Sequence, residues 1–184
     1  MRHRIFNVAA RLFLKQGYHE TSMREVAEAA GMGKSTLYDY FPSKEEILLY
    51  FVEQEMDATH QDAVQIAAMN LPVEEKLRRI LGSLWVYLDE NREMAVLIDR
   101  ESSRLGERAN QRIASRRENY RKILESVLRQ GIQDGIFRSV NPTLAASALH
   151  SMMTMPWLEQ GEHEDIIETA DELIDLFLGG IKVH

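Results

Sequence analysis

Helical periodicity runs through almost the whole chain and leaves little room for any other regular structure. Apolar residues recur at steps of three and four, and no alternating run of β-branched residues is long enough to predict a strand. The 184 residues include only four prolines, at positions 42, 72, 142 and 156, and the segments between them have a helical pattern. The sequence therefore predicts an all-α protein of about nine helices.

The N-terminal quarter of the chain divides into three short helices separated by glycines. The first ends at Gly17, and the second starts at Ser22, with Glu25 three residues further on as the partner in a capping box. Gly31 follows the second helix, at a turn where a positive φ is expected, and the third helix covers residues 34–40. Two short helices joined by a tight turn, with a third helix beneath them, form a helix-turn-helix.

The third helix starts with short polar side chains, which is the end that a recognition helix places in the major groove of DNA. Two tyrosines on the same helix carry hydroxyls that can reach phosphates, and a lysine follows near the start of the next helix. The candidate DNA contacts from this segment are Lys34, Ser35, Thr36, Tyr38, Tyr40 and Lys44. Packing in the core remains the alternative for the tyrosines, and a solvated surface position remains the alternative for the lysines.

Asp39 lies on the same helix and brings a negative charge to the expected DNA face. Its carboxylate could accept a hydrogen bond from a cytosine amino group. It could equally form an ion pair with Lys34 or another basic side chain.

The segment around this turn resembles the DNA-binding segment of the tetracycline-repressor (TetR) family. The resemblance is carried by residues 21–48, which read TSMREVAEAAGMGKSTLYDYFPSKEEIL, and it extends over about residues 4–50. It implies a homodimer on a near-palindromic operator, held together by a four-helix bundle of the two C-terminal helices from each copy. It also implies a small-molecule effector that binds in the body and releases the DNA, and phosphate contacts by Ser22 and Thr21.

Charge is distributed unevenly along the chain. Residues 1–50 hold seven Lys or Arg against six Asp or Glu, whereas the remaining residues hold 15 against 23, so the net charges are +1 and −8. An acidic body argues against a protein that coats nucleic acid with its whole surface and fits local contact by the N-terminal part. We expect a DNA-binding domain at residues 1–46 and a ligand-binding and dimerisation domain at residues 47–184.

Start and stop signals also place the later helices. Ser43 is expected to cap the fourth helix, with Glu46 as its box partner. Pro156 is expected to kink or end the eighth helix. The ninth helix, at about residues 165–178, is expected to stop at the pair Gly179-Gly180. Its apolar stripe is wide enough to cover both a core and a partner copy.

Large apolar side chains in the body are candidates for the effector site. They are Trp85, Tyr120, Met152 and Trp157. Packing in the core remains the alternative for Trp85 and Tyr120, and packing in the core or in a dimer interface for Met152 and Trp157. The segment Asp99-Arg100-Glu101 and the arginines at 116, 117 and 121 indicate either ion pairs on a solvated face or the binding of an anionic ligand.

Several function classes find no support in the sequence. The chain has no cysteine, and it shows no nucleophile–base triad, phosphate-binding loop or hydride-cofactor fingerprint. The acidic run with His163 lacks the paired motifs of a metal-binding bundle, so no enzyme, metal or cofactor is expected. No stretch predicts a membrane span or a signal peptide, and the cytoplasm is the expected location. A helical protein-interaction module, a small-molecule carrier or enzyme, and an activator rather than a repressor remain alternatives.

Overall fold

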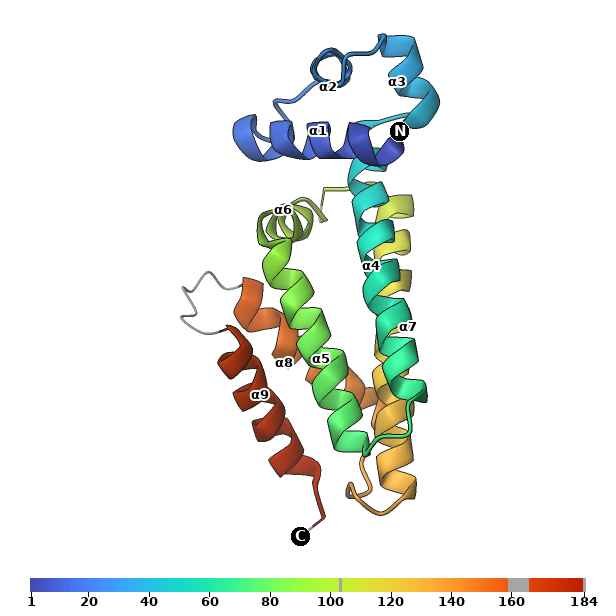
Figure 1. The fold of residues 1–184 in the computed structure, drawn as a ribbon, viewed down its shortest axis with the longest axis vertical. Helices are drawn as coiled ribbons and strands as arrows, with labels where there is room; N and C mark the ends of the chain where they lie inside the picture. Colours follow the sequence, from blue (N-terminus) through green and yellow to red (C-terminus); the bar gives the residue numbers. More distant parts are fainter. Residues whose placement is uncertain (103, 159–165, 184) are drawn as a thin grey trace. The chain divides into compact units, whose positions relative to one another are not determined.

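The computed structural model describes residues 1–102, 104–158 and 166–183. Regular structure within these residues is helical, apart from one antiparallel bridge between Phe137 and Lys182, so the prediction of an all-α fold is confirmed. Along the described chain the helices are α1 (Arg2–Gln16), α2 (Met23–Ala29), α3 (Lys34–Tyr40), α4 (Lys44–Ala68), α5 (Val73–Glu90), α6 (Arg92–Ser102), α7 (Glu107–Gln133), α8 (Pro142–Leu158) and α9 (Ile166–Ile181) (Figure 1).

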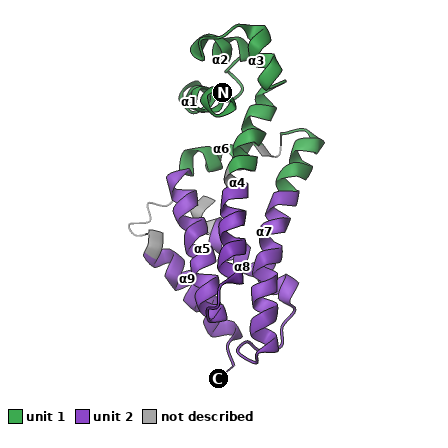
Figure 2. Cartoon of the chain, turned by 45° about the vertical axis from the view of Figure 1, so that its right-hand side comes forward, with its two compact units in different colours: residues 1–56, 92–114 green, residues 57–91, 115–184 purple. Residues whose placement is uncertain are grey.

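These helices form two compact units (Figure 2). The first unit comprises residues 1–56 and 92–114, so α6 and the start of α7 pack with the N-terminal helices. The second unit comprises residues 57–91 and 115–184. Because this division reports packing rather than independent folding, the domain boundary after residue 46 stays a prediction.

The first unit is built around an apolar cluster to which each of its helices contributes. Its fully buried members include Ile5 and Phe13 of α1, Leu37 of α3, and Phe41 at the end of α3. Burying a side chain of this size contributes roughly 1.5–3 kcal/mol. α1 contacts both α2 and α6, and α2 contacts α3, so the two short helices rest on a supported base.

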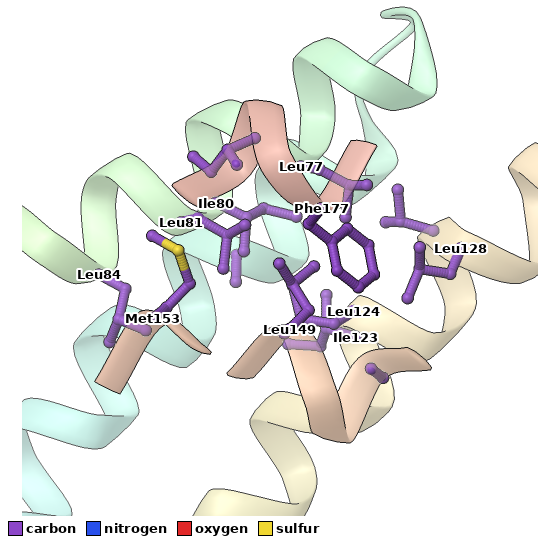
Figure 3. Close-up of a cluster of buried hydrophobic side chains, with 14 of the residues drawn as sticks. Leu77, Ile80, Leu81, Leu84, Ile123, Leu124, Leu128, Leu149, Met153 and Phe177 are labelled. Carbon is purple, nitrogen blue, oxygen red and sulfur yellow. The ribbon is translucent and has the colours of Figure 1, made fainter. Parts of the chain in front are cut away.

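The second unit has a larger apolar core between α5, α7, α8 and α9 (Figure 3). Leu77, Ile80, Leu81 and Leu84 come from α5, Ile123, Leu124 and Leu128 from α7, Leu149 and Met153 from α8, and Phe177 from α9. α9 packs mainly along α5 and also contacts α8. None of the helices within the described ranges combines the length and the apolar composition that a membrane span requires.

A close approach inside the second unit requires a glycine. A Cβ atom built on Gly131 would lie 2.3 Å from Cδ2 of Phe137, far inside van der Waals contact. Phe137 is only 2% exposed, so its ring has no room to withdraw. The absence of a side chain at Gly131 therefore lets this ring pack against α7.

The ends of α8 and α9 lie beyond the residues that were expected to stop them. α9 does not stop at Gly179-Gly180 but continues through both to Ile181. There the carbonyl of Ile181 accepts a hydrogen bond from the Arg138 amide at 2.8 Å, and the Val183 amide donates to Ile136, so tertiary pairing carries the chain past the glycines. α8 continues through Pro156 to Leu158, so the proline does not end the helix, and the alternative of a kink stays a prediction. The acidic run with His163 lies outside the described residues.

Candidate nucleic-acid interface

The turn between α2 and α3 has the geometry that its glycine predicts. Gly31 adopts φ +64°, in the left-handed region that favours glycine. Its amide donates to the carbonyl of Glu28 at 3.0 Å, and the Met32 amide donates to Ala27 at 3.0 Å. These two bonds satisfy carbonyls at the end of α2 and set the direction in which α3 begins.

α2 begins with the predicted capping box. The hydroxyl of Ser22 accepts from the Glu25 amide at 3.2 Å, and the Ser22 amide donates to the Glu25 carboxylate at 2.7 Å. The Ser22 hydroxyl donates to the same carboxylate at 2.7 Å, which helps to hold the pKa of Glu25 below its ordinary value. Ser22 is therefore exposed but held in position at the end of α2.

α3 presents a polar edge above a buried face. Lys34, Ser35 and Thr36 are all exposed, whereas Leu37 is completely buried. Tyr38 is 41% exposed, and the ammonium of Lys34 lies 5.7 Å from the centre of its ring. This arrangement leaves three adjacent polar side chains at the start of α3 open to solvent.

The last turn of α3 has a mixed environment. Tyr40 is half-buried and packs against the apolar cluster of the first unit. Asp39 is exposed and has no ion-pair partner in the described part of the chain, so the alternative of a bond to Lys34 is not realised there. Its carboxylate stays available at the surface.

Two predicted contact residues also have bonds inside the protein. Thr21 is 1% exposed, and its hydroxyl donates to the carbonyl of Gly17 at 2.7 Å. Lys44 donates from Nζ to the carbonyls of Tyr18 and His19, at 2.6 and 3.1 Å, and lies 4.8 Å from the centre of the Tyr18 ring. Burial is the main cause that lowers the pKa of Lys44. Both residues thus hold the loop between α1 and α2.

A buried carboxylate ties the same loop to α6. Glu101 is 2% exposed, and its Oε2 lies 2.7 Å from Nε2 of His19. Arg100 bonds the other oxygen at 3.2 Å, and Arg104 lies within 3.7 Å. Burial raises the pKa of Glu101, but His19 and the two arginines outweigh it and hold that pKa below its ordinary value.

A second set of ion pairs joins α4 to α7. Arg112 donates to the carboxylate of Glu46 at 2.9 Å and to that of Glu53 at 2.7 Å. The Ser43 hydroxyl caps α4 through the Glu46 amide, as predicted. The Glu46 carboxylate, expected as the box partner, is bound by Arg112 instead: Nη1 of the guanidinium lies 2.9 and 3.0 Å from its two oxygens, in charge-assisted hydrogen bonds.

The sequence did not indicate the structural role of the two N-terminal arginines. The guanidinium of Arg4 donates to the carbonyl of Ala30 at 2.7 Å, directly before the turn glycine. Arg2 lies over the ring of Phe41, 4.8 Å from its centre. Both contacts join residues that are distant in sequence, so no local pattern could have indicated them.

The candidate effector residues lie in the second unit. Trp85 is 1% exposed and Tyr120 is 5% exposed, with the Tyr120 hydroxyl donating to the carbonyl of Ile80 at 3.0 Å. Met152 is partly buried against the same apolar core. The side chain of Trp157 lies outside the described residues. Whether any of these residues contacts a ligand stays a prediction.

Two family models match the chain. Residues 5–51 match a model described as bacterial regulatory proteins, tetR family, and residues 70–181 match one described as tetracyclin repressor-like, C-terminal domain. The second match alone covers more than half of the chain.

Solved structures of similar fold cover the full length of the chain. The transcriptional regulator PfmR from Thermus thermophilus is 30% identical, with a TM-score of 0.81 and coverage of 96% of this chain and 97% of that one. AibR, solved with isovaleryl coenzyme A and operator DNA, is 25% identical, with a TM-score of 0.76 over 96% and 97% of the two chains. FadR from Bacillus subtilis, solved with stearoyl-CoA, has the same fold at 21% identity, with a TM-score of 0.85 over both full chains.

Proposed function

Because the chain belongs to the tetR family of bacterial regulatory proteins, we propose that it is a homodimeric transcriptional repressor. It binds a near-palindromic DNA operator and is released from it by a small-molecule effector. The observation that carries this proposal is the exposed polar edge of α3, formed by Lys34, Ser35 and Thr36 and fixed on the packed helices of the first unit. A rigid, polar helix start of this kind is the element that enters a major groove.

The DNA contacts fall into two classes. Lys34, Ser35 and Thr36 read base edges, where a lysine can donate to guanine and a hydroxyl can serve either base. Ser22, Tyr38 and Tyr40 bind phosphates and position the helix. All of these side chains are exposed except Tyr40, which is half-buried.

Lys44 and Thr21 both hold the loop between α1 and α2 in position and contribute to DNA binding. An ammonium has three N–H donors, and two of those on Lys44 serve backbone carbonyls, so one remains for a phosphate. The buried Thr21 hydroxyl shapes the loop that presents Ser22, and its part in phosphate binding is correspondingly indirect.

The dimer forms through α8 and α9, within the ligand-binding and dimerisation domain proposed at residues 47–184. Large apolar side chains on and just after these helices are exposed in the single chain: Leu144 is 68% exposed, Leu176 69% and Val183 58%. A second copy that covers them would remove this apolar surface from water. The DNA-binding domain is proposed at residues 1–46.

The effector is an acyl thioester. The protein acts in the cytoplasm and catalyses no reaction. Two relatives of the same fold were solved with acyl-coenzyme A molecules. The second unit offers an apolar core, which suits an acyl chain. Binding energy from such a ligand shifts DNA affinity by about 5–150-fold when it favours one state of the dimer by roughly 1–3 kcal/mol.

Selection of duplexes from a random DNA pool tests the proposed function. The purified protein should enrich one near-palindromic sequence, with half-sites about one helical turn apart or somewhat more. Fluorescence anisotropy on that duplex should then show release when acyl-CoA is added. Enrichment of no sequence, with binding equally weak for all duplexes, would show that the helix-turn-helix serves another purpose.

A further inference from the structure

Two side-chain nitrogens of the second unit are enclosed by protein and have no hydrogen-bond partner among the described residues. They are Nδ1 of His60 on α4 and Nε1 of Trp85 on α5. Trp85 is only 1% exposed. An indole N–H can donate but cannot accept, so an oxygen or nitrogen acceptor is the group that satisfies it. Folded proteins rarely retain a buried donor of this kind unless it serves a function.

The helix register places residues His60 and Trp85 at the same height in the second unit. α4 and α5 are consecutive helices joined by a short connection (Figure 1). The Ser83 hydroxyl donates to the carboxylate of Asp62, which fixes one level of this antiparallel pair. In an antiparallel pair, moving toward the N-terminus of one helix corresponds to moving toward the C-terminus of the other. Position 60, two residues before Asp62, is therefore level with position 85, two residues after Ser83.

Two other polar side chains of this region, Tyr120 and His150, are either bonded within the protein or neutral. The hydroxyl of Tyr120 donates to Ile80, about 7.5 Å below Trp85 along α5. The Tyr120 ring lies against that of His150, with centres 6.0 Å apart. Burial, followed by the charges of Arg121 and Arg117, lowers the pKa of His150 to about 4, so this imidazole is neutral at pH 7. Unlike these two side chains, the indole N–H of Trp85 is a donor without a partner among the described residues.

The rest of the surroundings is apolar. Trp85 belongs to the same buried cluster as Leu81, Leu84 and Met153, and Figure 3 shows Leu84 and Met153 close together. An ionised carboxylate would lose its hydration among these apolar side chains. A neutral carbonyl oxygen accepts hydrogen bonds and is far cheaper to bury.

We propose that Trp85 Nε1 donates a hydrogen bond to the thioester carbonyl oxygen of the effector, and that His60 Nδ1 is the second polar contact of the same group. The acyl chain then lies against the apolar side chains around Trp85. This inference rests on the proposed function, because it concerns how the acyl thioester named there is held. Trp85 and His60 would be the residues by which the protein distinguishes a thioester from an alkyl chain of the same length.

The test compares two ligands that differ only in the carbonyl. Isothermal titration calorimetry measures the affinity of stearoyl-CoA and of S-octadecyl-CoA, a thioether in which a methylene replaces the carbonyl. Trp85→Phe removes the indole N–H and keeps an aromatic ring. It should weaken binding of stearoyl-CoA by about tenfold, the size of one hydrogen bond, and leave the affinity for the thioether unchanged. Operator binding without ligand should equal that of the unaltered protein.

Tyr120→Phe is the matched control, because it deletes a buried hydroxyl whose partner is internal. Its effect should be the same for both ligands. If Trp85→Phe lowered the affinity for both ligands equally, or lowered neither, the proposed hydrogen bond would be overturned. The proposal that the effector is an acyl thioester would then still stand. If the unaltered protein binds no short-, medium- or long-chain acyl-CoA, the proposed effector class fails, and the inference fails with it.

Discussion

The two compact units differ in whether every buried polar side chain of the described residues has a hydrogen-bond partner. In the first unit, the buried Thr21 hydroxyl and the buried Glu101 carboxylate both have hydrogen-bond partners. In the second unit, the Trp85 and His60 nitrogens have none among the described residues. A fully bonded unit keeps one shape, which suits a surface that must match DNA. A unit with unbonded nitrogens gains stability when a ligand supplies the missing acceptor.

The two units also differ in where their ion pairs lie. The first unit uses ion pairs such as Arg112 with Glu46 and Glu53 to fix helices against each other. The second unit contains the larger apolar core, to which α4, α5, α7, α8 and α9 contribute, and carries ion pairs such as Arg78 with Asp171 at the surface. Substitutions should therefore disturb DNA reading through contacts in the first unit and ligand response through contacts in the second.

A matched pair of core truncations gives the largest expected effect. Phe41 of the first unit and Phe137 of the second are 0% and 2% exposed. Phe41→Ala and Phe137→Ala should each lower the free energy of unfolding by about 3–5 kcal/mol in urea denaturation. The milder Phe41→Leu should reduce operator affinity, whereas Phe137→Leu should not. Equal losses of operator affinity in the two leucine variants would remove the distinction between the units.

The second unit should lose stability between pH 6.5 and pH 4, a higher pH range than that of the first unit. The His150 pKa, lowered to about 4 from 6.5, means that the unfolded chain takes up this proton first as the pH falls. Stability from this group is therefore complete above pH 6.5 and declines down to pH 4, by up to about 3 kcal/mol. Urea denaturation across this range should show the decline, and His150→Gln should flatten it. An unaltered slope in the variant would contradict the buried, neutral imidazole.

The first unit should lose stability in a more acidic range. The pKa of Glu101 is held below its ordinary value of 4.5, so its contribution is complete above pH 4.5 and is lost as the pH falls through the lowered value. Glu101→Gln should cost about 1.5–3 kcal/mol at pH 7, the range for a hydrogen bond to a charged group. It should also remove the corresponding acid limb from thermal denaturation curves. A variant as stable as the unaltered protein at pH 7 would show that the His19 contact contributes nothing.

Substitution of two lysines of the first unit should give the smallest changes in binding free energy. The two variants should also separate base reading from phosphate binding most clearly. Lys34 is exposed, so Lys34→Ala should leave the melting temperature unchanged and relax base preference at one operator position, at a cost of about 1–2 kcal/mol. Lys44→Ala should weaken binding to every duplex, lower the salt slope by about one unit, and reduce the melting temperature because two carbonyls lose their donor. Identical behaviour of the two variants would refute their separate roles.

Local signals predicted the local structure well. Ser22 and Glu25 form the expected capping box, Gly31 has the expected positive φ, and Leu37 is buried as its spacing indicates. Each of these depends on neighbours within four residues. The all-α fold followed for the same reason, because helix periodicity is a local property.

Tertiary contacts account for what the sequence could not predict. The bond between His19 and Glu101 joins residues 82 positions apart, and those of Arg112 span 59 and 66 positions. The pairing of Ile181 with Arg138 carries α9 past two glycines that would end an isolated helix. The ion-pair interpretation of the 99–101 segment agrees with the structure, although the sequence did not indicate that Glu101 would be buried.

The salt dependence of operator binding tests the central claim most directly. Anisotropy of the unaltered dimer on its selected duplex, without effector, should give a binding constant whose logarithm falls linearly with the logarithm of salt concentration. Its affinity should exceed that for a scrambled duplex by about 10³-fold or more at physiological salt. If affinity is insensitive to salt, or is the same for both duplexes, α3 does not read DNA and the account fails.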